Sequence, residues 1–305
     1  RAMIFSEEFW AEEGGAPLLK LDGQWLKKEA DSGALATRVA RWPEMCGANP
    51  DAIVLKDDKE DDYDRIFVHD AERTWTSTKN RAMAMSVLQA CSDEFGDYHQ
   101  GLGYVASFLC LTCSRPAALA ILFQLNKEER YLPGYWKSAP QNYVRDTMVY
   151  SSLVEKHFPE AGKKLAESGV VPESYVSKWF IGLCVHMLPF PALLEYFEGV
   201  LEHGYVYLFK FALSLVQTIS DQLLATTATQ IDKLSKLVRL DKSIFPPEDS
   251  EFFLGIVRRA HDFDITKEEI DELRVTQFAL LQEKLRIAKE REEKLKAEAG
   301  SDDEI

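Results

Sequence analysis

The chain has 305 residues, enough for one large domain or two interlocked lobes around a substantial hydrophobic core. Hydrophobic residues make up 46% and charged residues 28%, which is typical of a folded globular protein and not of a disordered one. The 50 acidic residues outnumber the 36 basic residues, for a net charge of −14. This excess disfavours nucleic acid as a partner, and also a polybasic contact with an anionic membrane.

The cysteines and the start of the chain indicate where the protein works. No apolar core of a secretory signal follows Arg1, and a start at a residue other than Met suggests a piece of a longer protein. No stretch of about 18 uninterrupted apolar residues predicts a membrane-spanning helix. We therefore expect a cytoplasmic protein with five free thiols: Cys46, Cys91, Cys110, Cys113 and Cys184.

Residues 1–64 are mixed in character and end in an acidic cluster at residues 57–64. A solvated loop is the favoured interpretation of this cluster, and a metal site is the alternative. Lys59 and the consecutive spacing of the carboxylates suit neither tight coordination nor a single helix face.

From Arg81 onward the pattern is helical. Apolar residues recur near a 3.6-residue period up to Gly96, and residues 101–113 are apolar on nearly every side, as in a buried helix. Pro116 fits the first turn of the next helix. The following segments predict helices near residues 141–157, from Pro172 to Leu188, 192–203 closed by Gly204, and 205–224.

Beyond Pro247 the composition shifts. A short helix is expected over residues 248–264, and Thr266 with Glu269 forms a capping box for another helix. The first half of that helix should pack on the body. Its Lys/Glu-rich second half should be solvated or frayed, a coiled coil being the alternative, and residues 300–304 should be disordered. Strand and hairpin signals are sparse, so the fold class is all-α.

Conventional catalytic patterns are missing. The sequence has no Gly-rich phosphate loop, no His-Glu-x-x-His and no Gly-x-Ser-x-Gly. Cys110 and Cys113 have the spacing of a metal or disulfide pair, but they lie in an apolar helix without further ligands, which favours core packing. No cofactor or metal of its own is expected.

Two short segments remain. Phe67, Asp70, Arg73 and Thr74 follow the pattern aliphatic-x-x-Asp-x-x-Arg-Thr, and Tyr98, Gln100 and Gly101 give Tyr-x-Gln-Gly. Both segments resemble the signature motifs of the TBC domain, the catalytic module of Rab GTPase-activating proteins.

Other motifs align with this family in order over roughly residues 33–225. Arg38 and Trp42 resemble its opening Arg-x-x-x-Trp, with Val39 where Gly is usual. Phe197 and Glu198 replace the usual Trp and Asp of a later motif. The further matching segments are residues 157–160 with Leu165, Trp179-Phe180 with Leu188-Pro189, and Glu202-His203-Gly204.

The resemblance implies a two-lobed helical domain, with residues 1–150 as the N-terminal lobe and 151–305 as the C-terminal lobe with a charged tail from about 267. It implies that Arg73 and Gln100 reach in trans into a GTP-bound Rab-family GTPase, which carries the GTP and Mg²⁺. Asp70 would pair with or orient Arg73, and Tyr98 would pack beneath the glutamine loop. Gly101 would allow close backbone approach, with Arg38 and Trp42 structural.

The implied role is in vesicle trafficking, with membrane association only through the partner. The acidic net charge weakly predicts a basic contact face on that GTPase.

Each motif also has a plain structural interpretation. Asp and Arg three residues apart form ordinary surface ion pairs, and Tyr-His-Gln-Gly is a plausible turn. Two alternative functions remain: an inactive TBC scaffold that binds a GTPase or a trafficking complex, and a helical adaptor that recruits partners through residues 267–296.

Overall fold

The computed structural model describes residues 2–13, 23–55, 63–227 and 229–301, and in these ranges it contains helices and no strand. The all-α prediction is therefore confirmed. The acidic cluster predicted as a solvated loop falls largely outside the described residues, since only Tyr63 and Asp64 of it are included.

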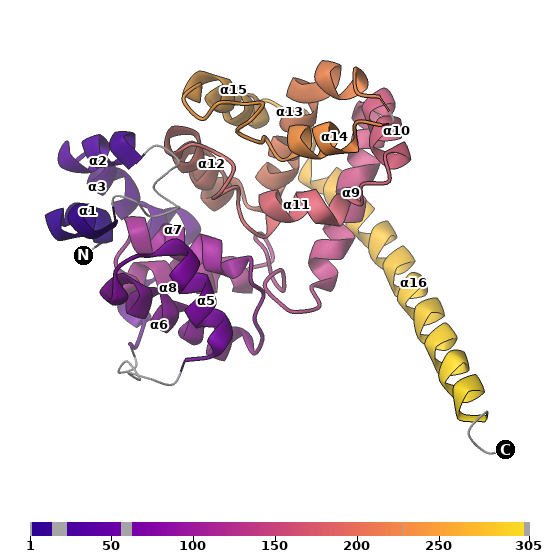
Figure 1. The fold of residues 1–305 in the computed structure, drawn as a ribbon, viewed down its shortest axis with the longest axis horizontal. Coiled ribbons are helices and arrows are strands. Elements are labelled where there is room, and N and C mark those ends of the chain that lie inside the picture. The colour runs from indigo at the N-terminus through magenta and orange to yellow at the C-terminus, as the bar shows by residue number, and fades with distance from the viewer. Residues whose placement is uncertain (1, 14–22, 56–62, 228, 302–305) are drawn as a thin grey trace.

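The N-terminal group of helices, indigo to magenta in Figure 1, carries the motifs of residues 67–101. Its described part consists of η1 (Met3–Phe5), α1 (Glu7–Glu13), α2 (Gly23–Asp31), α3 (Ala34–Ala40), α4 (Trp42–Cys46), η3 (Pro50–Ala52), α5 (Arg65–Thr74), α6 (Thr78–Phe95), α7 (Leu102–Thr112) and α8 (Arg115–Lys127). Helix α7 is buried along nearly its whole length, as its apolar sequence predicts.

The remaining helices form the second group, pink to yellow in Figure 1. They are α9 (Gln141–His157), α10 (Pro159–Glu167), α11 (Pro172–Phe180), α12 (Phe190–His203), α13 (Tyr205–Leu224), α14 (Ile231–Val238), α15 (Ser250–His261) and α16 (Lys267–Ser301). Helix α9 packs against α10, α11, α13 and α16. A lobe boundary at residue 150 would fall inside this helix.

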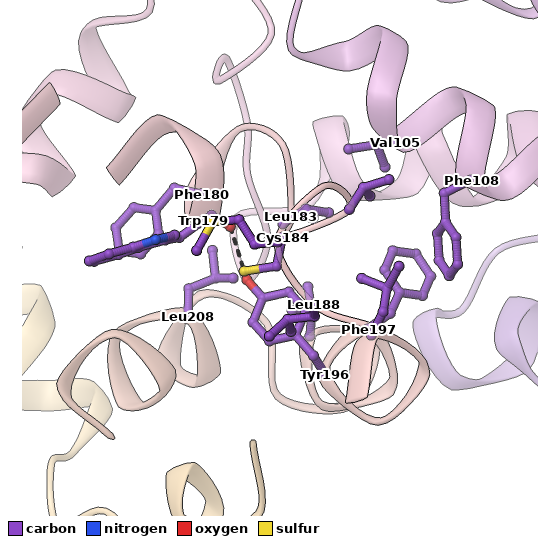
Figure 2. Close-up of a cluster of buried hydrophobic side chains, with 14 of the residues drawn as sticks. Val105, Phe108, Trp179, Phe180, Leu183, Cys184, Leu188, Tyr196, Phe197 and Leu208 are labelled. Carbon is purple, nitrogen blue, oxygen red and sulfur yellow. Dashed lines mark hydrogen bonds between the residues drawn. The ribbon is translucent and has the colours of Figure 1, made fainter. Parts of the chain in front are cut away.

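A buried aromatic cluster joins the two groups (Figure 2). Val105 and Phe108 of α7 face Phe197 of α12, and the Phe108 and Phe197 rings lie 5.3 Å apart. Tyr196 donates a hydrogen bond to the Trp179 carbonyl at 2.9 Å, which ties α12 to the end of α11. Because these side chains are fully buried, the two groups share one core.

Gly204 marks a second close contact between the groups. It follows α12 with φ 63°, and a Cβ atom there would lie 1.8 Å from the carbonyl oxygen of Arg130. The next residue, Tyr205, donates its backbone N–H to that same oxygen at 2.9 Å. Only glycine fits this crossing, so the predicted helix stop at Gly204 is confirmed.

Two expectations about helix ends are wrong. The helix that starts at Pro172 ends at Phe180, well before Leu188, because Leu183 and Cys184 adopt positive φ angles of 43° and 60° in the turns that follow. At the other end of the chain, α16 includes Gly300 and Ser301, where disorder is expected, while residues 302–304 of that expectation lie outside the described residues.

Helix α16 packs on α9 through its first half and then extends away from the body (Figure 1). The capping box is half formed: the Glu269 backbone N–H donates to the Thr266 hydroxyl at 3.2 Å, while the Glu269 carboxylate pairs with Lys156. Leu285 and Leu295 are exposed on the projecting part. The predicted division into a packed half and a solvated half is confirmed.

The five cysteines are free and buried, and burial raises the pKa of Cys110 and Cys113 to about 12. Core packing of this pair is confirmed. Within the described ranges, no cluster of three metal-ligating side chains occurs. Nor does any described helix have the length and apolar character needed to cross a bilayer.

Candidate functional site

Helix α5 presents Arg73 to solvent. The Asp64 side chain caps its first turn by accepting the Ile66 N–H at 3.0 Å. Phe67, Asp70 and Thr74 lie on the buried face of this helix. The side chain of Arg73, one turn after Asp70, is 63% exposed.

The glutamine loop, residues 96–101, connects α6 to α7. Gly96 ends α6 with φ 67°. The His99 Nδ1 atom accepts the Gly101 backbone N–H at 2.9 Å, and the Leu102 N–H donates to the His99 carbonyl at the same distance. Burial lowers the pKa of His99, which favours the neutral ring that this acceptor role requires. The turn leaves Gln100 exposed.

Asp70 brings the arginine and the glutamine together. Its Oδ1 atom accepts a hydrogen bond from Gln100 Nε2 at 3.1 Å and lies 3.7 Å from Arg73 Nη1. Its Oδ2 atom accepts the Tyr98 hydroxyl at 2.6 Å. The Asp70 carboxylate is only 8% exposed, so one buried anion holds an exposed guanidinium and an exposed carboxamide on the same side.

Tyr98 supports this arrangement from below. Burial and the hydrogen bond to Asp70 raise the pKa of Tyr98, so its hydroxyl stays protonated and keeps donating. The Tyr98 ring meets Phe67 edge-to-face at 4.9 Å. Gly103 packs closely beneath this pair, because a Cβ atom on it would lie 3.2 Å from Asp70 Oδ2 and 3.3 Å from the Tyr98 oxygen.

The second helical group buttresses the loop at Gly101. A Cβ atom at this position would lie 2.4 Å from the Cγ2 atom of Ile181, which follows α11. Ile181 is buried, and its carbonyl accepts the Trp136 indole N–H at 3.1 Å. The absence of a side chain at Gly101 therefore makes room for Ile181, and the approach of the Gly101 backbone to a partner stays a prediction.

Glu13 is a supporting residue that the sequence did not reveal. Its fully buried carboxylate, at the end of α1, accepts the backbone N–H groups of Thr76 and Ser77, each at 2.7 Å, and the Asn80 amide at 2.9 Å. Thr76 and Ser77 lie between α5, the helix that carries Arg73, and α6, while Asn80 lies in the first turn of α6. Glu13 thus holds the start of α6 from outside, a contact that no local sequence pattern signals.

Comparison with known proteins shows which family the chain belongs to. The family model of the Rab-GTPase-TBC domain matches residues 52–224, more than half of the chain. The chain belongs to the Rab-GTPase-TBC domain family. Two solved TBC domains share the fold: that of a Chlamydomonas flagellar RabGAP (TM-score 0.58, 19% identity, covering 76% of this chain and 80% of that one) and that of Skywalker/TBC1D24 from Drosophila melanogaster (TM-score 0.55, 15% identity, 85% and 94%).

Several curated proteins are similar in sequence to parts of this chain. Carabin of Mus musculus is 26% identical over 202 residues, 60% of this chain and 45% of that protein. Growth hormone-regulated TBC protein 1 of Homo sapiens is 28% identical over 172 residues, 53% and 49%. The GTPase-activating protein GYP5 of Saccharomyces cerevisiae is 29% identical over 124 residues, 39% and 13%. This TBC chain spans about half the length of the first two relatives.

Arg38 and Trp42 precede the matched part of the TBC domain yet join its core. Arg38 donates two hydrogen bonds of 2.6 Å to the Glu198 carboxylate, and the Trp42 indole N–H donates to Glu198 Oε1 at 3.0 Å. The Trp42 and Phe197 rings lie 5.0 Å apart. Phe197 and Glu198, which replace the usual Trp and Asp of the later motif, thus both contact residues of the opening Arg-x-x-x-Trp motif.

Proposed function

We propose that this TBC domain is a GTPase-activating protein for a Rab-family small GTPase, with Arg73 and Gln100 inserted in trans beside the bound nucleotide. The GTPase carries the GTP and the Mg²⁺ ion, so the TBC chain needs no cofactor of its own. It works in the cytoplasm and reaches endomembranes, and thereby vesicle trafficking, through that partner.

Arg73 supplies charge stabilisation. In the transition state of GTP hydrolysis, negative charge is spread over the γ-phosphoryl oxygens and the leaving oxygen. A guanidinium delivered there stabilises this state more than the ground state, and arginine fingers accelerate hydrolysis by roughly 10³–10⁵-fold. This corresponds to roughly 4–7 kcal/mol of barrier lowering. The planar fork of Arg bridges two oxygens, which the point charge of Lys does not.

Gln100 positions the attacking water. Its carboxamide donates through Nε2 to Asp70 at 3.1 Å. The carbonyl oxygen of the same group has no protein partner among the described residues and is available to accept a hydrogen bond from water. Asp70 and Tyr98 orient this amide, and the His99–Gly101 turn sets the direction of the loop.

One observation carries the proposal. Arg73 Nη1 and Gln100 Nε2 both lie near the same atom, Asp70 Oδ1, although they come from different helix ends. Both side chains are exposed, whereas the carboxylate and Tyr98 that hold them are mostly buried. If the exposed Arg73 guanidinium and Gln100 carboxamide had no function, nothing would require the buried Asp70 carboxylate to align them.

The test is phosphate release from a panel of GTP-loaded Rab proteins, comparing the wild type with Arg73→Ala and Gln100→Ala. We expect at least one Rab to be stimulated by the wild type. Arg73→Ala should lower kcat by about 10³-fold or more. Gln100→Ala should also lower kcat, with both variants retaining the wild-type fold by circular dichroism.

Two matched controls come from the same helices. Arg65→Ala removes an exposed Arg two turns earlier on α5, and Gln89→Ala removes a partly exposed Gln on α6; both should stimulate as the wild type does. A Rab stimulated equally by wild type, Arg73→Ala and Gln100→Ala would contradict the dual-finger mechanism. Binding without stimulation across a complete panel would favour the inactive scaffold instead.

A further inference from the structure

A small pocket of about 160 Å³ lies directly beside Gln100, between the glutamine loop and the turns that follow α11. We name it the Lys178 pocket. Its wall combines apolar groups with a few polar ones, and none of the residues around it is acidic. The side chains on this wall include Tyr104, Ser177, Lys178, Ile181, His186 and Met187.

Lys178 is a half-buried cation on this wall. Its ammonium lies 5.5 Å from the centroid of the Tyr104 ring, and Tyr104 in turn meets His186 edge-to-face at 4.2 Å. Among the described residues, no carboxylate lies within ion-pair distance of Lys178. The aromatic contact fixes the position of the charge without neutralising it.

A second cation reinforces the first. Arg239 follows α14 and is exposed, and it too has no carboxylate partner in the described part of the chain. Burial and the charge of Arg239 lower the pKa of Lys178, as expected for neighbouring cations that lack an anion. The chain has 50 acidic and 36 basic residues, yet the residues around the Lys178 pocket include no acidic one.

We propose that the Lys178 pocket receives the carboxylate of an Asp or Glu side chain from the partner GTPase, docked next to Gln100. This inference rests on the proposed function and names the chemistry of the partner surface that the site recognises. The methylene stem of the acidic side chain packs against Ile181 and Met187. Its carboxylate is held by Lys178 and by the Ser177 hydroxyl.

The size and chemistry of the pocket favour this occupant. A volume of about 160 Å³ admits one side chain and not a folded element. Opposite charges across an interface align the partners and exclude competitors that place a cation or an apolar group there. The contact face expected on the GTPase is therefore acidic at this point, opposite to the expectation from the net charge of the chain.

The experiment measures affinity for a GTPase loaded with a non-hydrolysable GTP analogue, and the kcat and KM of stimulated hydrolysis, for Lys178→Glu and Lys178→Met. The matched control is Lys284→Glu, which makes the same charge change at an exposed position on the projecting part of α16. We expect Lys178→Glu to weaken binding roughly 10–100-fold through KM, with kcat largely retained. Lys178→Met should weaken binding less, and the control should match the wild type.

A charge swap identifies the source of the carboxylate. Each acidic residue of the GTPase switch segments is changed to Lys in turn, and one of these variants should restore the affinity of Lys178→Glu. The absence of any restoring partner would overturn the proposal.

Unchanged binding by Lys178→Glu, alongside lost stimulation by Arg73→Ala, would overturn this inference and leave the proposed function intact. A wild type that neither binds nor stimulates any GTPase would overturn both.

Discussion

Asp70 organises the candidate site at the scale of single residues. It accepts hydrogen bonds from Tyr98 and Gln100, which lie 28 and 30 positions further along the chain. The amide of Gln100 is thus restrained before any partner arrives, and less side-chain entropy remains to be lost on binding. Preorganisation of this kind lowers the cost of reaching the transition state.

His99 predicts a pH dependence at the same scale. Its lowered pKa keeps the ring neutral down through its ordinary value of about 6.5. The contribution of the Nδ1–Gly101 hydrogen bond is therefore fully present above about pH 6.5 and is lost as the pH falls through the lowered pKa. Stimulated hydrolysis should be flat between pH 8 and 6.5 and decline in more acidic buffer.

The variant His99→Asn tests this assignment, because an Asn side chain can accept the same i+2 N–H without titrating. Its activity, divided by that of the wild type at each pH, should rise as the pH is lowered. His69→Asn, at an exposed position on α5, should keep the wild-type profile. Identical pH profiles for the wild type and His99→Asn would show that protonation of His99 does not determine the conformation of the glutamine loop.

The sequence predicts the contact between Asp70 and Arg73 but not the hydrogen bonds that Asp70 accepts from Tyr98 and Gln100. Asp70 and Arg73 were expected to pair because they lie three residues apart on one helix. In the structure the Arg73 contact, at 3.7 Å, is longer than the hydrogen bonds that Asp70 accepts from Tyr98 and Gln100. Contacts between distant segments depend on how α5, α6 and α7 pack, which local spacing does not encode.

At the scale of elements, Glu13 joins α1 to the start of α6. We expect Glu13→Gln to destabilise this junction, because an amide nitrogen would face donors that a carboxylate now accepts. A buried N–H left without an acceptor costs about 1–3 kcal/mol. Hydrogen exchange at the Thr76 and Ser77 amides should quicken, and stimulated hydrolysis should weaken because the connection after Arg73 loosens.

Glu12→Gln is the matched comparison, since Glu12 is the exposed neighbour of Glu13 on the same helix. It should leave both amides protected. Unchanged hydrogen exchange at the Thr76 and Ser77 amides in Glu13→Gln would mean that the Glu13 carboxylate does not stabilise the junction.

The ends of helices that Pro or Gly residues mark are predictable from the sequence, whereas the irregular connection between α11 and α12 is not. Pro and Gly residues marked the ends of α8, α9 and α12 close to where the structure has them. The apolar run from Trp179 to Leu188 looked like helix, yet Leu183 and Cys184 take positive φ angles there. Tertiary packing around Tyr196 and Phe197 overrides the local preference in this segment.

At the scale of the whole molecule, α16 is fastened to α9 by a buried charge. Arg274 donates to Asp146 Oδ1 at 3.0 Å and also to Oδ2, and Asp146 is fully buried beside Arg145 and Tyr135. Removing one partner of such a pair leaves a buried charge undercompensated. Arg274→Met should lower the free energy of unfolding by about 3 kcal/mol, measured by urea denaturation.

Arg286→Met provides the control on the same helix, where the ion pairs with Glu283 and Glu290 are exposed. It should leave the midpoint of unfolding unchanged. Equal midpoints for Arg274→Met and wild type would show that Arg145 alone compensates Asp146.

The Arg38–Glu198–Trp42 contact has a practical consequence for where this domain can be cut. A polypeptide trimmed to the matched residues, 52–224, keeps Glu198 and Asp146 but discards Arg38, Trp42 and Arg274. The Glu198 and Asp146 carboxylates would then lose their contacts with Arg38 and Arg274, and the residues just before α6 would lose Glu13. The smallest part of the chain that folds on its own is therefore longer than residues 52–224, the part that matches the family model.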